Sequence, residues 1–150
     1  MAAKRKQNSK SKVAVRALSI GQPWAELILR HRKPFEVRSW KTNYRGPLLM
    51  HASQRVNVTA AQALGIDRQK LVGGAFVGWA KLVDVRPFTR ADAKLLKKRR
   101  GDDDGAWEPH LFSWVLKNVR RIKPVPFKGR LGLFTPPASV LRRVRKRRAG

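Results

Sequence analysis

The residues best suited to chemistry lie between positions 33 and 38, in the segment KPFEVR. On a β-strand, Glu36 and Arg38 share a face because successive side chains alternate. Lys33 precedes Pro34, which favours an extended backbone from which the lysine can point back at the other two side chains. A lysine, an arginine fork and one carboxylate can bind a phosphate or a base edge, or can form an ion-pair network that closes the sheet.

The same cluster could carry catalysis. A lysine acts as a nucleophile or base when burial or a neighbouring cation lowers its pKa. Arg32 and Arg38 would lower the pKa of Lys33, whereas Glu36 would raise it, so the sequence leaves this alternative open. If the protein is an enzyme, we expect Lys33 and Glu36 to be its catalytic residues.

Aromatic and cationic residues are interleaved directly after this cluster, at Trp40, Lys41, Tyr44 and Arg45. Aromatic faces can stack unpaired bases while cations hold the phosphates. Trp40 can equally be a core residue, whereas Tyr44 and Arg45 are expected at an exposed turn. We therefore add these four residues to the candidate nucleic-acid-binding site.

Other catalytic or metal-binding patterns are missing from the sequence. His31, His51 and His110 lack the spacing of metal ligands, and we expect His51 to be a buried histidine with satisfied hydrogen bonds. The chain has no cysteine, which excludes disulfides, thiol catalysis and cysteine-ligated zinc. It contains no glycine-rich phosphate loop and no Ser/His/Asp signature. We expect neither a metal nor a cofactor.

The charge of the chain indicates a polyanionic partner. Thirty-five Lys and Arg face nine Asp and Glu, which gives a formal net charge of +26. Such an excess of one sign opposes folding unless an anion binds. We expect a disordered basic tail over 1–12, a domain over 13–140 and a basic tail over 141–150. The second tail adds these candidate nucleic-acid contacts: Arg142, Arg143, Arg145, Lys146, Arg147 and Arg148.

Competing explanations of the charge are a basic proteome and an anionic membrane surface. The basic segments lack the apolar face of a membrane-surface helix, and no apolar run is long enough to span a membrane. The first residues lack the apolar stretch of a secretory signal. We expect no membrane partner and an intracellular, most simply cytoplasmic, location.

Short apolar stretches between turn residues predict the elements that position the site. Glycines interrupt one long strand, as at a barrel corner, and Asn57 and Thr89 are expected helix caps. Residues 101–105 read as an exposed acidic loop. The pattern predicts an α+β fold, a small mixed β-barrel with a few short flanking helices. We expect strands over 13–20, 35–40, 47–52, 73–85, 112–125 and 128–135, and helices over 24–32, 58–64 and 89–100.

Residues 31–53 resemble the signature region of the ASCH family within the PUA-like superfamily. The family pattern is G-x-K-x-x-E-x-R; Lys33, Glu36 and Arg38 match it, and His31 replaces the glycine. The flanking blocks LSIGQPWAELIL, GAFVGWAKLVDV and FSWVLKNVRRIKPVPFKGRLGLF agree, so the resemblance covers about 15–136.

This resemblance implies a PUA-like β-barrel whose cleft is lined by the motif, and a role in RNA binding. Some members are amidohydrolases of acylated cytidine or ribonucleases. In the amidohydrolases the motif lysine is catalytic and a threonine follows three residues later; here Glu36 stands at that position.

Three hypotheses follow. The first is a binding module for RNA or single strands, with RNA favoured over DNA, whose cleft recognises a nucleotide or modified base. The second is a hydrolase of modified nucleosides, or a ribonuclease, that uses the same cleft. The third is a structural protein whose basic tails dock on ribosomal RNA or DNA.

Overall fold

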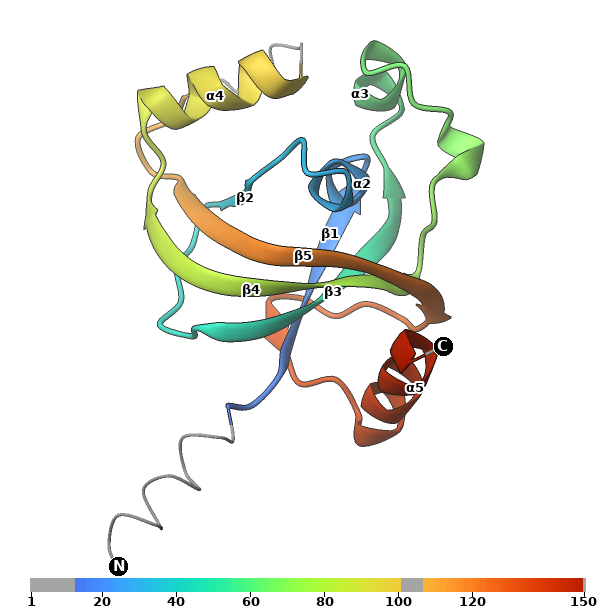
Figure 1. Ribbon diagram of the computed structural model, residues 1–150. Helices are drawn as coiled ribbons and strands as arrows, with labels where there is room; N and C mark the ends of the chain where they lie inside the picture. Colours follow the sequence, from blue (N-terminus) through green and yellow to red (C-terminus); the bar gives the residue numbers. More distant parts are fainter. Residues whose placement is uncertain (1–12, 101–106, 150) are drawn as a thin grey trace, which may run out of the picture.

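The computed structural model describes residues 13–100 and 107–149 (Figure 1). The side chains of 98–100 and 147–149, the expected tail 1–12 and the expected acidic loop 101–105 lie outside the described residues.

One curved sheet of six strands forms the centre of the molecule, in the order β2-β5-β4-β3-β1-β6 (Figure 1). The pair β1–β3 is parallel, and the other neighbours are antiparallel, so the sheet is mixed. The strands are β1 (Arg16–Gln22), β2 (Phe35–Arg38), β3 (Gly46–Val56), β4 (Ala75–Pro87), β5 (Phe112–Pro126) and β6 (Leu133–Phe134).

Short helices connect these strands, and two of them begin at the expected caps. The Asn57 side chain accepts a hydrogen bond from the Ala60 N–H at 2.9 Å. The Thr89 hydroxyl accepts from the Asp92 N–H, and the Asp92 carboxylate accepts from the Thr89 N–H, each at 3.1 Å. Such reciprocal bonds satisfy N–H groups that a helix start leaves unpaired. The helices are α2 (Trp24–Leu29), α3 (Val58–Ala63), the 3-10 turn η1 (Arg68–Lys70), α4 (Arg90–Arg100) and α5 (Ala138–Ala149).

Apolar side chains fill both faces of the sheet. Strand β3 shows the alternation, because Leu48 and Met50 join the core under α2, whereas Leu49 joins the core under α5. Val140 and Val144 of α5 are buried in this second core. The segment expected as a basic tail from residue 141 therefore belongs to a helix that packs on the domain.

The sheet is not closed into a barrel within the described chain, so that part of the predicted fold is not confirmed. Strands β2 and β6 are its edges. A side chain bridges the gap between β2 and β1: the Arg38 Nη2 donates to the Ser19 carbonyl at 2.6 Å. The α+β class and the mixed sheet are confirmed.

The strand expected over 128–135 is wrong for most of its length. Among those residues the structure has strand at Leu133–Phe134. Gly132 has a φ of +66°, which leaves the extended region. A Cβ at Gly129 would lie 2.6 Å from the Ser19 hydroxyl, so this backbone passes directly over β1. Residues 127–132 thus form a loop beside the candidate site, which we call the 127–132 loop.

Candidate functional site

A large cleft opens beside the motif, with a volume of about 1280 Å³. Strands β1, β2 and β3, the start of α2, and the 127–132 loop line most of it. Among the described residues, five cations and one carboxylate, Glu36, line the cleft. The cations are Lys33, Arg38, Arg55, Lys128 and Arg130.

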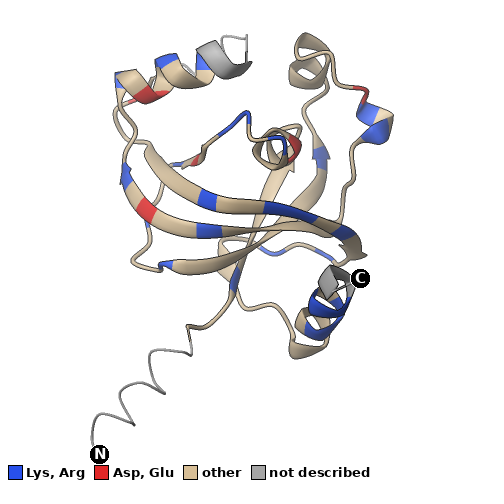
Figure 2. Ribbon diagram, viewed as in Figure 1, with Lys and Arg blue, Asp and Glu red and all other residues tan. Residues whose placement is uncertain are grey.

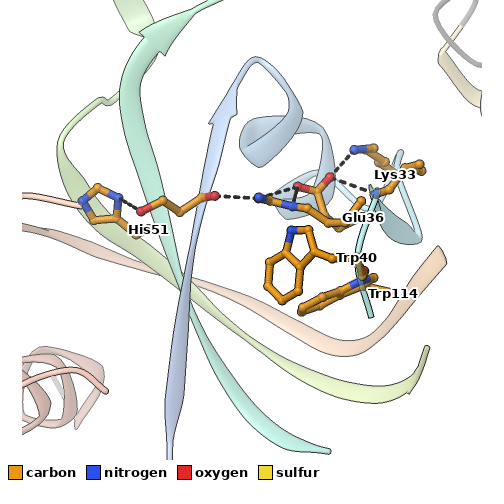
Figure 3. Close-up of polar contacts among 8 residues, drawn as sticks. Lys33, Glu36, Trp40, His51 and Trp114 are labelled. Carbon is orange, nitrogen blue, oxygen red and sulfur yellow. Dashed lines mark hydrogen bonds and ion pairs between the residues drawn. The ribbon is translucent and has the colours of Figure 1, made fainter. Parts of the chain in front are cut away.

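The motif residues form one compact charge cluster in this cleft (Figure 3). The Lys33 Nζ lies 2.6 Å from one oxygen of Glu36. The Arg38 Nε and Nη2 donate to the other oxygen at 3.2 and 3.0 Å. The side chains of Lys33 and Glu36 are 5% and 8% exposed, whereas that of Arg38 is 23% exposed. The predicted convergence of these residues is what the structure shows, and Arg38 is the member with access to solvent.

Glu36 is ionised in this setting. Burial alone would raise the pKa of its carboxyl, but the charges of Lys33 and Arg38 and the hydrogen bonds from Lys33 and the Val37 N–H outweigh burial. The pKa of Glu36 is therefore lowered from its ordinary 4.5. One negative charge between two positive charges leaves the cluster cationic.

Arg38 keeps part of its hydrogen-bonding capacity for a ligand. Its Nε and Nη2 are occupied by Glu36 and the Ser19 carbonyl. Its Nη1 donates no hydrogen bond to any residue in the described ranges 13–100 and 107–149. A guanidinium held in place by two of its nitrogens, with the third available, is suited to recognise a phosphate oxygen or a base acceptor.

Ser19 and His51 form a hydrogen-bonded pair in the lining of the same cleft (Figure 3). The Ser19 hydroxyl is 3.0 Å from the His51 Nδ1, and the His51 Nε2 is 2.6 Å from the Phe127 carbonyl. A carbonyl can only accept, so Nε2 carries the proton and Nδ1 accepts from Ser19. Burial lowers the pKa of His51 despite the Phe127 bond, which keeps the ring neutral at pH 7. This is the buried, satisfied histidine that we expected, and it ties the 127–132 loop to β3.

Two tryptophans give the cleft an aromatic wall. Trp40 is partly buried and meets Trp114 edge-on at 4.7 Å between ring centroids. The Trp114 Nε1 donates to the Trp40 carbonyl at 3.1 Å, which fixes this pair. Trp24, the first residue of α2, also lines the cleft. Trp40 thus combines both predicted roles, core packing and cleft lining.

The structure does not bring Lys41, Tyr44 and Arg45 into the cleft. The Tyr44 hydroxyl bonds the Ala14 and Pro47 carbonyls, and burial raises its pKa. Arg45 donates to the carbonyls of its own turn and lies 3.7 Å from Asp84. Lys41 is exposed, 5.9 Å from the Phe112 ring centroid. These three residues lie in an irregular turn, where side chains do not alternate as they do on a strand. The sequence pattern therefore could not predict which way they point.

The C-terminal candidates lie on α5, away from the cleft. Four of them, Arg142, Arg143, Arg145 and Lys146, are exposed. Arg147 and Arg148 fall in the last turn of α5, and their side chains lie outside the described residues.

Sequence reasoning missed three cations at the rim of the cleft. Arg55 comes from the end of β3, and Lys128 and Arg130 come from the 127–132 loop. All three are exposed, and Arg130 lies 5.4 Å from the centroid of the Phe127 ring. The triplet KGR at 128–130 is a usable signal for such a rim, but it falls within the strand that the sequence pattern predicts.

The described residues contain no group of three metal-ligating side chains. No helix in that part of the chain has the length and apolar character needed to cross a bilayer.

The protein is thus an α+β domain built on a mixed sheet, with a cationic cleft beside its K-x-x-E-x-R motif. The family profile described as "ASCH domain" matches residues 18–126, and the chain belongs to this family. ASCH domains are PUA-like domains that are often linked to RNA binding. No curated protein matches the chain.

Solved structures of an ASCH protein from Zymomonas mobilis share the fold. The chain is similar to that protein with a TM-score of 0.56 and 12% identity, over 90% of this chain and 96% of the other. Two mutant forms of the same protein give TM-scores of 0.55 and 0.56 at 12% and 13% identity. These alignments cover 88% and 89% of this chain and 96% of each of those chains. Helix α5 begins beyond the residues that match the family profile.

Proposed function

We propose that this protein binds single-stranded nucleic acid, with RNA preferred, and holds one nucleotide or modified base in the cleft. The observation that carries the proposal is the state of Arg38. Glu36 and the Ser19 carbonyl hold its guanidinium in a cleft lined by five cations, and its Nη1 is left for a ligand. A planar fork of fixed orientation favours recognition of a phosphate or base edge over diffuse attraction.

The rim of the cleft supports a polymer rather than a free nucleotide. Arg55, Lys128 and Arg130 are exposed and can contact phosphates on either side of the held nucleotide. The Trp24 and Trp40 rings offer surfaces on which a base can stack. Reading unpaired bases by stacking and edge contacts is the usual mode of single-stranded RNA recognition.

The geometry supports binding over hydrolysis through Lys33. Its ammonium lies 2.6 Å from the buried Glu36 carboxylate. An ammonium engaged in this ion pair has no lone pair for attack. We therefore assign Lys33 and Glu36 the role of positioning Arg38.

The test measures the affinity for a labelled single-stranded RNA by fluorescence anisotropy at several salt concentrations. Replacing Lys128 and Arg130 together by Gln should weaken binding and lower the slope of log K against log salt by about 0.7 for each phosphate that the variant no longer neutralises. The matched control replaces Arg68 and Lys70, two exposed cations on η1 that lie outside the lining of the cleft.

Three results would contradict the proposal. They are binding that does not respond to salt, equal losses of affinity in the two double variants, and DNA of the same sequence binding as tightly as RNA. Equal losses would mean that the net charge alone attracts the polymer. The last result would remove the RNA preference and leave single-strand binding.

A further inference from the structure

A second, smaller hollow lies where β4 and β5 meet helix α5. Its volume is about 340 Å³, and among the described residues it shares no lining residue with the cleft. Figure 2 shows Lys and Arg on α5 and on β5. The polar side chains that line the hollow are Trp79, Lys81, Asn118, Arg120 and Arg145.

A β-bulge shapes this hollow. Trp79 pairs with Arg120 and Lys81 pairs with Lys117, so two residues of β5 stand opposite one residue of β4. Asn118, one of the two, has a φ of +54°, which few residues other than glycine adopt. Bulges redirect side chains and are frequent next to functional sites.

Helix α5 supplies the other wall. Val140 and Val144 pack in the same core cluster as Trp79, which fixes the helix against the sheet. Arg145 follows Val144 directly and lines the hollow. One cation from each of three elements, β4, β5 and α5, therefore meets at this place.

The charged side chains that line the hollow are all positive, and they stand beside the apolar residues Val13, Val15, Pro47 and Ala80. Within residues 13–100 and 107–149, no carboxylate lines the hollow, and Lys81, Arg120 and Arg145 have no ion-pair partner. Trp79 is 7% exposed, and within the same residues its buried Nε1 donor has no hydrogen-bond partner.

We propose that this hollow is a second binding site, which takes a phosphate group of the nucleic-acid backbone. Arg120, Arg145 and Lys81 turn onto the phosphate, and the Trp79 side chain forms part of the wall beside it. A phosphate offers acceptors and negative charge, which match the three cations at the hollow. The inference rests on the proposed function and adds a second anchor for the same polymer.

The surroundings favour a polymer with repeated anions over an acidic protein segment. Arg142, Arg143 and Lys146 are exposed on α5 and continue the positive surface beyond the hollow. Repeated phosphates can occupy such a surface without a defined sequence, because backbone contacts are insensitive to the base. An acidic partner protein is the competing occupant, and a titration with polyglutamate distinguishes it.

Tryptophan indole N–H resonances can test both sites in one NMR titration of isotope-labelled protein. Trp40 reports on the cleft and Trp79 on the hollow. Replacing each by Phe assigns its resonance, and among the described residues the Trp79 indole donates no hydrogen bond that Trp79→Phe could remove. On adding short single-stranded RNA, we expect the Trp79 resonance to shift and saturate. The shift should be lost when Arg120 and Arg145 are both replaced by Gln.

The outcomes separate the two proposals. A shift of Trp40 without Trp79 would overturn the hollow and keep the cleft. A shift of Trp79 without Trp40 would keep the hollow and overturn the cleft, and no shift of either would reject both. A Trp79 response to polyglutamate but not to RNA would replace the phosphate by an acidic protein partner.

Affinity measurements give the expected size of the effect. When one phosphate is no longer neutralised, the slope of log K against log salt falls by about 0.7. If the affinities are equal at about 1 M salt, this change makes binding about fourfold weaker at about 0.15 M salt. The variant with Arg120 and Arg145 replaced should show at least this loss of affinity. The control with Arg68 and Lys70 replaced removes the same charge and should retain the wild-type slope. Equal slopes in both variants would overturn the site.

Discussion

Replacing Glu36 by Gln tests whether the charge cluster is the structural support of the cleft. The substitution keeps the size and an acceptor oxygen but removes the charge that faces Lys33 and Arg38. The Lys33 side chain, 5% exposed, would then hold an ammonium without its carboxylate. Removing one partner of a buried ion pair costs about 3 to 5 kcal/mol of unfolding free energy.

For a chain of this size, each kcal/mol lowers the melting temperature by about 2 to 4 °C. We therefore expect Glu36→Gln to melt roughly 6 to 20 °C below the wild type, measured by circular dichroism and urea unfolding. The matched control is Glu108→Gln, whose side chain is 56% exposed beside His110. A change within about 0.5 kcal/mol is expected there.

The pH dependence checks the same reasoning. Because the folded pKa of Glu36 lies below the ordinary 4.5, its ionisation stabilises the fold fully above pH 4.5. That contribution is lost as pH falls through the folded pKa. Glu36→Gln should therefore lose less stability than the wild type on acidification below pH 4.5. A loss under about 1 kcal/mol at pH 7, or parallel acid profiles, would refute a desolvated structural ion pair.

Two further predictions concern the elements around the cleft. Burial lowers the folded pKa of His51 below its ordinary 6.5, so the wild type should lose stability as pH falls from 6.5 through the folded pKa. His51→Gln should flatten this part of the pH profile of stability measured by urea unfolding. An unchanged profile would contradict the prediction. A Cβ at Gly78 would meet the Arg120 carbonyl at 2.7 Å and the Leu29 Cδ2 at 2.5 Å, so Gly78→Ala should cost about 1 to 3 kcal/mol in thermal unfolding. Gly21→Ala is its control, because the added Cβ meets Trp24 at an ordinary 3.5 Å; equal effects of the two substitutions would contradict the clash.

The sequence was sufficient for features that depend on near neighbours. Pro34 and the alternation of a strand predicted that Lys33, Glu36 and Arg38 would converge, and they do. Asn57 and Thr89 were identified as helix caps because a cap bonds within its own first turn. The motif and its flanking blocks also indicated the ASCH family, which the family profile confirms.

Long-range packing decided the rest. Nothing local shows that Arg38 reaches the Ser19 carbonyl, or that Gly129 passes over Ser19 and His51 and so turns 127–132 into the rim of the cleft. The role of α5 also depends on burial of Val140 and Val144 against strands distant in sequence. That packing brings Arg145 to the hollow that Trp79 lines. The two residues are far apart along the chain, so only the folded structure could show that they are neighbours.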